Sequence, residues 1–337
     1  MVPGKIRYLM NPIMKKFILT LMAALCLIPA AAEVDYDVDV EVAYGLDHLP
    51  SLKKAVEQNT ARILAEMNEA ADRNRGMNYS KVKIADDARH VLNNLWASQR
   101  MRYASFDEEF NTPVSEKVAL NEYGEYELRN IPMVFINPAD PADSHYEEIG
   151  FRFSPSGEII DVFVTIERNQ FQKMLNSMTE VRDESRRLTI LYWMEALATA
   201  YHEKNLKWFN QFLSDDVLVV TGSRRYTSTG EKYNGYTNLG KEAFIKRLRN
   251  TFSRNAVIEV KFSNMTIYGH PLDDEGRYYA VECEQSYYSS TYSDEGNLTV
   301  IWDFGRKDQP QILFRGWTEK DDPTKFNIID AVKLNLD

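Results

Sequence analysis

Hydrophobic and polar residues in the last third of the chain follow first a helical and then a strand-like spacing. The apolar run from Leu191 to Tyr201 predicts a long amphipathic helix, and the apolar group from Trp208 to Val220 predicts a short helix that leads into a strand. From there to residue 319 the two kinds of residue alternate. This alternation predicts four or five antiparallel strands closed by a hairpin.

The preceding part of the chain repeats this order. One helical face is predicted between Leu52 and Ala71, and a second helix from about Asp86. Strands are predicted after it, at 116–123, 126–136, 145–153 and 158–166, with a tight turn at Pro155-Ser-Gly157 before the last. Because helices followed by an antiparallel meander occur twice, we predict an α+β fold of two related tandem domains.

The predicted segments follow from these patterns and from the length of the chain. They are a signal peptide at 1–32, an acidic N-terminal arm at 33–50, an N-terminal α+β domain at 51–166, a helical linker at 167–187, a C-terminal domain at 188–319 and a C-terminal tail at 320–337. The arm alternates acidic and apolar residues, as a strand does. It lacks the Gly and Glu that a calcium-binding EF-hand loop needs, since Val40 and Leu46 occupy those positions.

The first 32 residues have the parts of a secretory signal peptide. Lys15 and Lys16 precede an apolar run that ends at Ile28, and small residues follow up to Ala32, after which we expect cleavage. The apolar run is too short to span a bilayer comfortably. Met14 is an alternative start of the chain. We expect export to the periplasm or the cell surface.

Cys26 and Cys283 are the two cysteines of the sequence. Lipidation of Cys26 would anchor the protein to a membrane, but the residue before a lipidated cysteine is normally small and here it is Leu25. Cleavage after Ala32 would leave Cys283 alone. We therefore expect no intrachain disulfide.

The charge of the chain argues against two classes of partner. The formal net charge is −10, and no stripe of basic residues interrupts the acidic balance. Phosphate backbones and anionic lipids are bound through clustered Lys and Arg. We expect no binding to nucleic acid, and none to membranes apart from the lipidation alternative.

No sequence motif for nucleotide, thiol or serine chemistry is present. The histidines do not have the spacing of metal ligands, so a metal site would have to be assembled from distant segments; they are His48, His90, His145, His202 and His270. We predict no metal, no cofactor and no assigned catalytic residue. Tyr201 and His202 remain as acid–base candidates, although a histidine at a helix end is more often structural.

The element order of residues 186–319 resembles that of the NTF2-like (cystatin-like) superfamily, and residues 50–166 resemble it more weakly. The resemblance implies two tandem domains, each with helices packed on a curved antiparallel sheet that forms a cone. It also implies two kinds of function. Enzymes of the superfamily use a carboxylate or histidine with a tyrosine inside the cone, whereas other members only bind a ligand, so fold alone does not decide function.

Alternation predicts which side chains face the core of the second domain. Between Tyr278 and Tyr288 the predicted core face comprises Tyr279, Val281, Cys283, Gln285 and Tyr287, which leaves Glu282 and Glu284 on the opposite face. In the closing hairpin, Asp303 and Arg315 are predicted to meet across the strands as an ion pair.

Tyrosines mixed with Arg, Ser and Gly are the strongest sign of a binding surface. They occur in a predicted loop, Gly222–Tyr236, and a predicted turn, Ser286–Ser293, and such residues suit adaptable recognition. The predicted ligand-binding residues are Trp193, Tyr201, Tyr226, Tyr236, Tyr287, Trp302 and Arg315. The ligand class stays open between a small molecule, a glycan and a protein.

These observations favour an exported, non-catalytic binding or interaction protein. An NTF2-like enzyme of the isomerase, dehydratase or hydrolase type is one alternative, and it predicts a buried histidine or carboxylate beside a tyrosine. A structural envelope-assembly component is another alternative, with a filled cone and association through the sheet into a homodimer.

Overall fold

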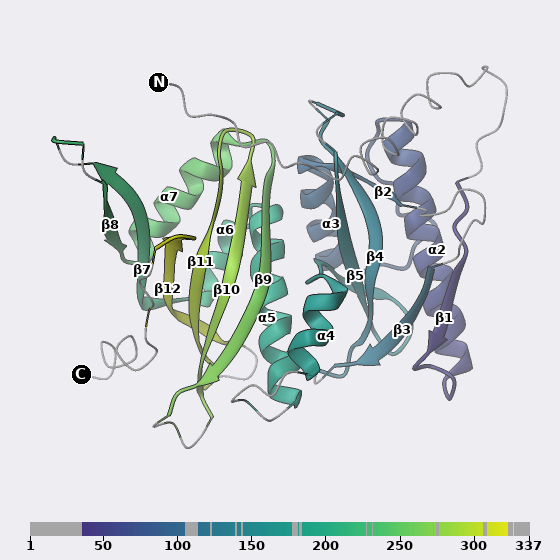
Figure 1. Cartoon of the computed structure of the whole chain (residues 1–337). Coiled ribbons are helices and arrows are strands. Elements are labelled where there is room, and N and C mark those ends of the chain that lie inside the picture. The colour runs from purple at the N-terminus through teal and green to yellow at the C-terminus, as the bar shows by residue number, and fades with distance from the viewer. Residues whose placement is uncertain are drawn as a thin grey trace. The chain divides into compact units, whose positions relative to one another are not determined.

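The computed structural model describes residues 36–104, 114–121, 123–138, 140–142, 144–176, 181, 184–226, 228–230, 232–271, 273, 276–305, 309–322 and 326. Helices pack against two six-stranded sheets (Figure 1), and the predicted α+β class is confirmed. By its internal contacts, Asp37–Asp337 is one compact unit. We call the part up to residue 166 the first half and the part from residue 184 the second half.

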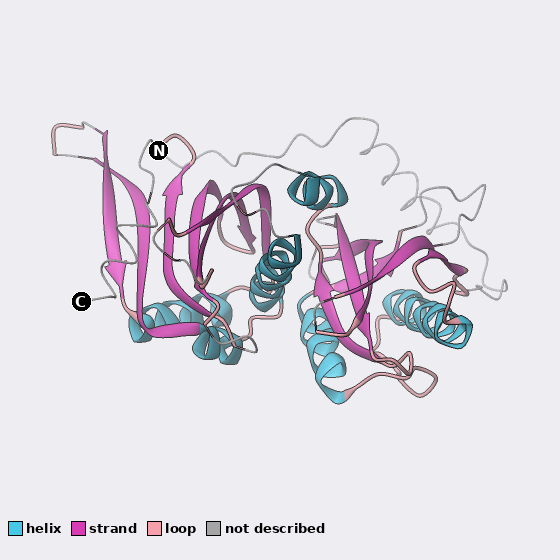
Figure 2. Cartoon of the chain, turned by 90° about the horizontal axis from the view of Figure 1, so that it is seen from below, coloured by secondary structure: helices cyan, strands magenta, loops and turns pink. Residues whose placement is uncertain are grey.

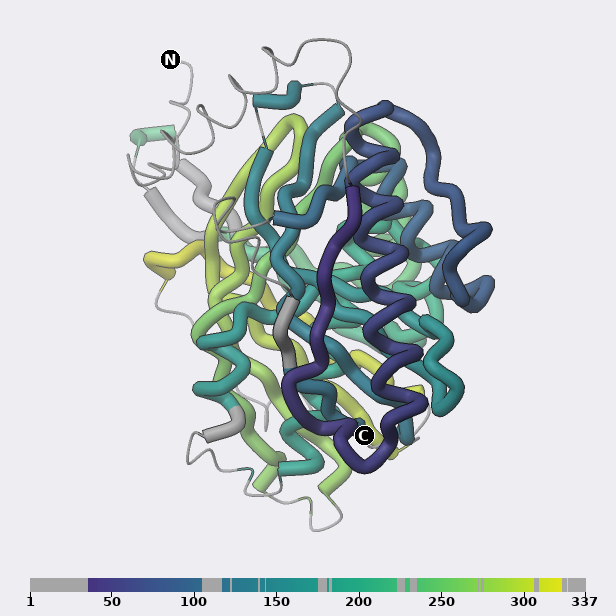
Figure 3. Tube along the Cα trace, turned by 90° about the vertical axis from the view of Figure 1, so that its right-hand side faces the viewer, coloured from purple at the N-terminus to yellow at the C-terminus, as the bar shows by residue number. Residues whose placement is uncertain are grey.

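The first half contains a sheet with two long helices on one side. Its elements are β1 (Val40–Tyr44), α2 (Pro50–Asp72), α3 (Asp86–Ser98), β2 (Arg100–Tyr103), β3 (Val114–Leu120), β4 (Tyr126–Ile136), β5 (His145–Phe153) and β6 (Ile159–Val164). The strand order is β1-β3-β4-β5-β6, and β2 pairs with β4. Figure 3 shows β1 running alongside α2. The helical face predicted on α2 is confirmed, because Leu52, Val56, Ile63, Met67 and Ala70 are all buried.

A buried asparagine fixes α2 to the turn between β5 and β6. The Asn59 side chain donates hydrogen bonds to the backbone oxygens of Lys83, at 2.6 Å, and Gly157, at 3.1 Å. Gly157 has a φ of +77°, and an added Cβ there would lie 2.5 Å from Ala55 Cβ on α2. Only glycine tolerates this positive φ together with so close an approach to Ala55. The tight turn predicted at 155–157 is therefore present and packed against the helix.

Helices α4 (Arg168–Asn176) and α5 (Glu184–His202) follow the first sheet. Helix α5 contacts both β6 of the first half and strand β9 (Ile258–Gly269) of the second. Its polar residues Glu195 and Thr199 are buried together with its apolar ones. A helix that is buried on all sides lies inside a protein rather than on its surface. Helix α5 is thus a shared packing element of both halves.

The second half has a strongly curved sheet with helices on its concave side (Figure 2). Its further elements are α6 (Leu206–Phe212), β7 (Leu213–Tyr226), β8 (Lys232–Leu239), α7 (Lys241–Arg254), β10 (Tyr278–Ser289), β11 (Ser293–Asp303) and β12 (Gln311–Glu319). The strand order is β8-β7-β12-β11-β10-β9. Strands β7 and β12 pair in parallel, and the other neighbours are antiparallel.

Two of the sequence predictions for this half are wrong. Residues 222–236 form most of the β7–β8 hairpin rather than a loop, with Tyr226 opposite Lys232. The Thr and Tyr residues of this segment favour strands, and the turn is confined to its middle. Asp303 does not meet Arg315, because Asp303 lies opposite Gln311 and forms an ion pair with Arg277 at 2.6 Å.

The core face predicted for residues 278–288 is confirmed. Tyr279, Val281, Cys283 and Gln285 are buried, while Glu282 and Glu284 are partly exposed. Burial raises the pKa of the Cys283 thiol, so the side chain is a neutral thiol. Cys283 is therefore a packing residue rather than a nucleophile.

Several predictions fall on residues outside the described ones. These are the signal peptide at 1–32 with Met14 and Cys26, part of the linker, and the tail from residue 327 onwards. Within the described residues, no helix combines the length and the apolar character needed to cross a lipid bilayer.

Candidate functional site

Aromatic side chains fill the space between α5, α6 and the concave face of the second sheet. Trp302 is fully buried at the centre, with its ring centroid 6.4 Å from that of Trp193. Trp193 packs in turn against Phe212, at 4.8 Å between centroids, and its Nε1 donates to the Tyr123 hydroxyl at 3.0 Å. These contacts belong to one continuous core. The interior of the second half is packed with side chains, and residues of the first half such as Tyr123 and Ile166 add to this packing.

Three of the predicted binding residues belong to this core. Trp193, Tyr201 and Trp302 expose 7%, 4% and 0% of their surface. The Tyr201 ring packs edge-on against Phe209, with centroids 4.7 Å apart. In this arrangement the three residues stabilise the domain, and they present no exposed face to a ligand.

The other predicted binding residues differ in their exposure, and two of them, Tyr287 and Arg315, pack against this core. Arg315 is buried and donates from Nη2 to the Gln285 side chain at 2.9 Å. Tyr287 is half-buried beside Tyr292, with ring centroids 6.3 Å apart. Tyr236 on β8 is 40% exposed. Tyr226 ends β7, and its side chain lies outside the description.

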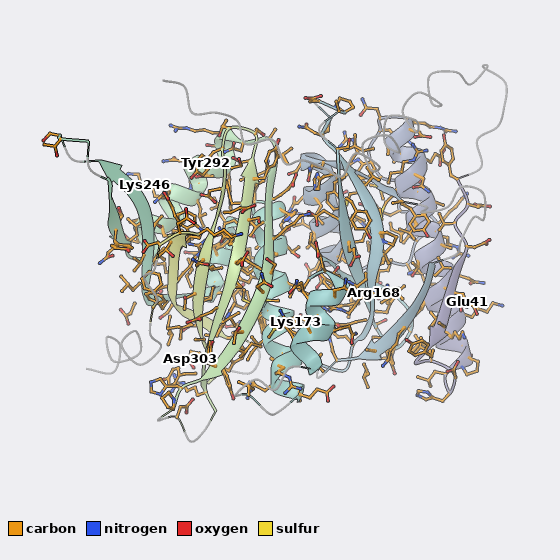
Figure 4. All side chains as sticks on the ribbon, in the orientation of Figure 1. Glu41, Arg168, Lys173, Lys246, Tyr292 and Asp303 are labelled. Carbon is orange, nitrogen blue, oxygen red and sulfur yellow. The ribbon has the colours of Figure 1, made fainter. Side chains whose placement is uncertain are left out.

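Two exposed tyrosines mark the rim of the second sheet. Tyr292, in the turn between β10 and β11, exposes 58% of its surface, and Figure 4 shows it at the opposite end of this hairpin from Asp303. The Tyr236 hydroxyl donates to Asp322 Oδ2 at 2.8 Å, which restrains the ring, and 40% of the residue remains exposed. Exposed tyrosines with fixed rings can contribute contact area to a partner at low entropic cost.

The acid–base candidate His202 has a structural partner. Its Nε2 accepts a hydrogen bond from the backbone N–H of Val260 at 3.0 Å, which places the last turn of α5 against the edge strand β9. Burial lowers the pKa of His202 to about 4, so the imidazole is neutral at pH 7. The acceptor role of Nε2 then puts the proton on Nδ1.

Charged side chains from both halves converge close to His202. His145 Nε2 lies 3.4 Å from Glu147 Oε1, and His145 Nδ1 lies 3.2 Å from Glu259 Oε1. The Lys261 ammonium is 2.8 Å from Glu147 Oε1. We call these four residues the His145 cluster. Gln99 Nε2 also donates to Glu259 Oε1 at 3.0 Å.

The two carboxylates of the His145 cluster have pKa values shifted in opposite directions. Burial would raise the pKa of Glu147, but the charges of Lys261 and His145 outweigh it and hold the value at about 2. Burial raises the pKa of Glu259. The nearby His145 lowers this pKa only in part, and the charge of Glu147 raises it further. The cluster thus contains one firmly ionised carboxylate and one that protonates more readily.

The comparisons with known proteins identify the second half. Residues 201–316 match the family model of the Cds6 C-terminal NTF2-like domain. They form an NTF2-like domain. The first half, with its helices against a second six-stranded and mainly antiparallel sheet, is consistent with another domain of this class. A comparison with curated proteins found no match.

Three solved structures are similar to parts of the chain. Bd1075 of Bdellovibrio bacteriovorus is 14% identical over 48% of this chain and 46% of its own, less than half of either, with a TM-score of 0.30. A protein of unknown function with a cystatin-like fold from Nostoc punctiforme is 11% identical over 41% of this chain and 92% of its own, with a TM-score of 0.29. A putative dehydratase of the NTF2-like family from Streptomyces avermitilis is 9% identical over 39% of this chain and 93% of its own, with a TM-score of 0.29.

A second polar network joins α5 of the second half to the first sheet. Arg152 donates to Glu127 at 2.8 Å and to Asp161, and its guanidinium lies 3.8 Å from the Phe163 ring centroid. Arg129 on β4 pairs with Glu195 on α5. Apart from the partly exposed Asp161, these charged side chains are largely buried, which indicates a structural joint between the halves.

Neither the His145 cluster nor the network of Arg152 and Arg129 was predicted from the sequence. The sequence does indicate which residues of the His145 cluster are neighbours within each strand. His145 and Glu147 are two residues apart on β5, and Glu259 and Lys261 are two apart on β9, so alternation places each pair on one face. The pairs are more than 100 residues apart in the chain. The packing of the two halves, with α5 against both β6 and β9, brings them together.

Proposed function

We propose that this protein is an exported, non-catalytic interaction protein whose NTF2-like domain is a packed scaffold for a partner protein. The burial of Trp302 carries the proposal. In an enzyme of this fold the concave face would have to admit substrate, whereas here Trp302 and Trp193 fill it. The histidine nearest to this core, His202, is already bonded to the backbone of β9.

The exposed tyrosines support a partner protein as the ligand. Tyr236 and Tyr292 are the large aromatic side chains of the described second half that expose more than about a third of their surface. Tyrosine is enriched in protein interfaces because its ring is apolar and its hydroxyl can form hydrogen bonds. Export is supported by the three-part pattern of residues 1–32.

Site-specific photo-crosslinking in cells tests this function. A photoreactive phenylalanine analogue placed at Tyr292 or Tyr236 should give a discrete adduct of higher mass, which mass spectrometry identifies. Tyr44 is 56% exposed on β1 of the first half and provides a matched control that should give none. The proposal fails if neither rim position yields an adduct, or if Tyr44 yields the same adduct as Tyr292.

A further inference from the structure

Three side chains with metal-ligand atoms meet where β5 of the first half approaches β9 of the NTF2-like domain. His145, Glu147 and Glu259 each offer one ligand atom, and these atoms lie within 4.8 Å of one another. Two of the residues come from β5 and one from β9. An ion held by all three would join the two halves.

Each carboxylate taken singly lies at the distance from a His145 ring nitrogen that a transition-metal ion requires of two of its ligands. Bonds of about 2.0–2.2 Å to nitrogen and carboxylate oxygen place two ligands of a tetrahedral ion roughly 3.4 Å apart. The His145 Nε2 to Glu147 Oε1 distance is 3.4 Å, and the distance from His145 Nδ1 to Glu259 Oε1 is 3.2 Å. Because the two carboxylates face different ring nitrogens, one glutamate side chain must rotate for all three residues to share one ion.

Buried polar atoms at this place lack hydrogen-bond partners among the described residues. His145 Nε2 and Glu147 Oε1 contact each other at 3.4 Å, and Glu147 Oε1 also contacts the Lys261 ammonium, but neither atom forms a further hydrogen bond. Glu147 is 6% exposed. Buried polar atoms are nearly always satisfied in native proteins. A bound cation would coordinate the His145 imidazole and take the place of the Lys261 ammonium at the Glu147 carboxylate.

The donor set selects the class of ion. One imidazole nitrogen and two carboxylate oxygens suit zinc and neighbouring transition metals. Calcium and magnesium are bound by oxygen ligands, which this set supplies only in part. The carboxylates of Glu147 and Glu259 would balance the two positive charges of the ion.

We propose that His145, Glu147 and Glu259 bind one divalent transition-metal ion of the zinc class, which clamps β5 to β9. The Lys261 ammonium lies against Glu147 and would compete with the ion for this carboxylate. The Lys261 side chain is 40% exposed, and its long stem allows the ammonium to withdraw into solvent when the ion binds.

A zinc titration of the purified, chelator-treated full chain tests the proposal. Competition with a chromophoric chelator should show one Zn²⁺ per chain. His145→Gln and Glu259→Gln should each weaken this binding by more than about tenfold, since each removes a ligand. Lys261→Gln should strengthen it by removing the competing charge. His48→Gln, a substitution of an exposed histidine, should leave it unchanged.

The thermal unfolding of each variant in metal-free buffer shows whether it is folded. If His145→Gln does not fold, Glu259→Gln decides, because the amide retains the shape of the side chain and an oxygen that can accept from Gln99. The proposal is overturned if the native chain binds no stoichiometric Zn²⁺. It is also overturned if a folded ligand variant binds Zn²⁺ as tightly as the native chain does, or if Ca²⁺ and Mg²⁺ compete equally with Zn²⁺.

Discussion

The carboxylate of Glu195 accepts a hydrogen bond from the backbone N–H of Ile166 at 2.8 Å. Glu195 lies on α5 of the second half, and Ile166 follows β6, the last strand of the first sheet. The same carboxylate pairs with Arg129 of β4. A helix that packs on its own curved sheet is therefore also bonded to the neighbouring half, and this bond makes the two halves depend on each other.

Replacing Glu195 should destabilise the whole chain. Glu195→Ala leaves the buried Arg129 guanidinium without its partner on α5, and breaking a buried ion pair in this way costs about 3–5 kcal/mol. Urea unfolding followed by circular dichroism would measure the loss. Glu41→Ala, at an exposed site on β1 (Figure 4), should change the free energy of unfolding by less than about 0.5 kcal/mol. Similar losses for both variants would contradict the structural role of Glu195.

Replacing Trp302 should remove the centre of the aromatic core. Trp302→Ala is expected to lower the free energy of unfolding by about 3–5 kcal/mol, because the surrounding rings cannot close the cavity. The exposed Tyr292→Ala provides the control and should cost less than about 0.5 kcal/mol. A loss below about 1 kcal/mol for Trp302→Ala would show that the core is loosely packed at this point.

His202 should make stability depend on pH below neutrality. Its pKa is about 4 in the folded protein against an ordinary value of 6.5, so the unfolded chain binds more protons between these values and stability falls as the pH drops. Between pH 7 and pH 5 this difference amounts to about 2 kcal/mol. Urea unfolding at both pH values should show this loss in the native chain and a smaller one in His202→Gln. His48→Gln should behave like the native chain, and an equal pH dependence in His202→Gln would refute the assignment.

Export can be tested through the first residue of the mature chain. Cleavage after Ala32 predicts that the exported protein begins at Glu33, and that a variant lacking residues 1–32 remains in the cytoplasm. Cell fractionation and N-terminal sequencing would check both. A lipid-modified Cys26 at the N-terminus would support the anchored alternative and contradict cleavage at Ala32.

Local sequence patterns were sufficient to predict much of the secondary structure of the first half. Strands β4 and β5 begin and end at the predicted residues, because the turn-rich segment 137–143 and the Pro155–Gly157 turn separate clear apolar patterns. The β7–β8 hairpin was mistaken for a loop, since its mixture of Tyr, Arg, Ser and Gly is typical of recognition loops as well as of exposed strands. Helix α7 and strand β2 were not predicted.

The arrangement of the candidate site could not be predicted from local patterns. Alternation places His145 beside Glu147, but nothing near these residues indicates that Glu259 faces them. That contact depends on the burial of α5 against both sheets, which is decided by packing over the whole chain. For the same reason Trp193, Tyr201 and Trp302 were predicted as ligand contacts although they pack in the core. An aromatic residue that faces a cone has the same sequence pattern whether the cone is open or filled.

The solvent accessibility of the Trp302 indole tests most directly the claim that the NTF2-like domain is a packed scaffold. The protein can be labelled with ¹⁵N-tryptophan, and each of the five indole signals can be assigned by a Trp→Phe variant. A soluble paramagnetic agent should leave the Trp302 signal sharp and broaden that of the partly exposed Trp208, and the Trp302 indole proton should exchange slowly. Broadening of Trp302 to the same degree as Trp208, with rapid exchange, would show an open cone and contradict the account.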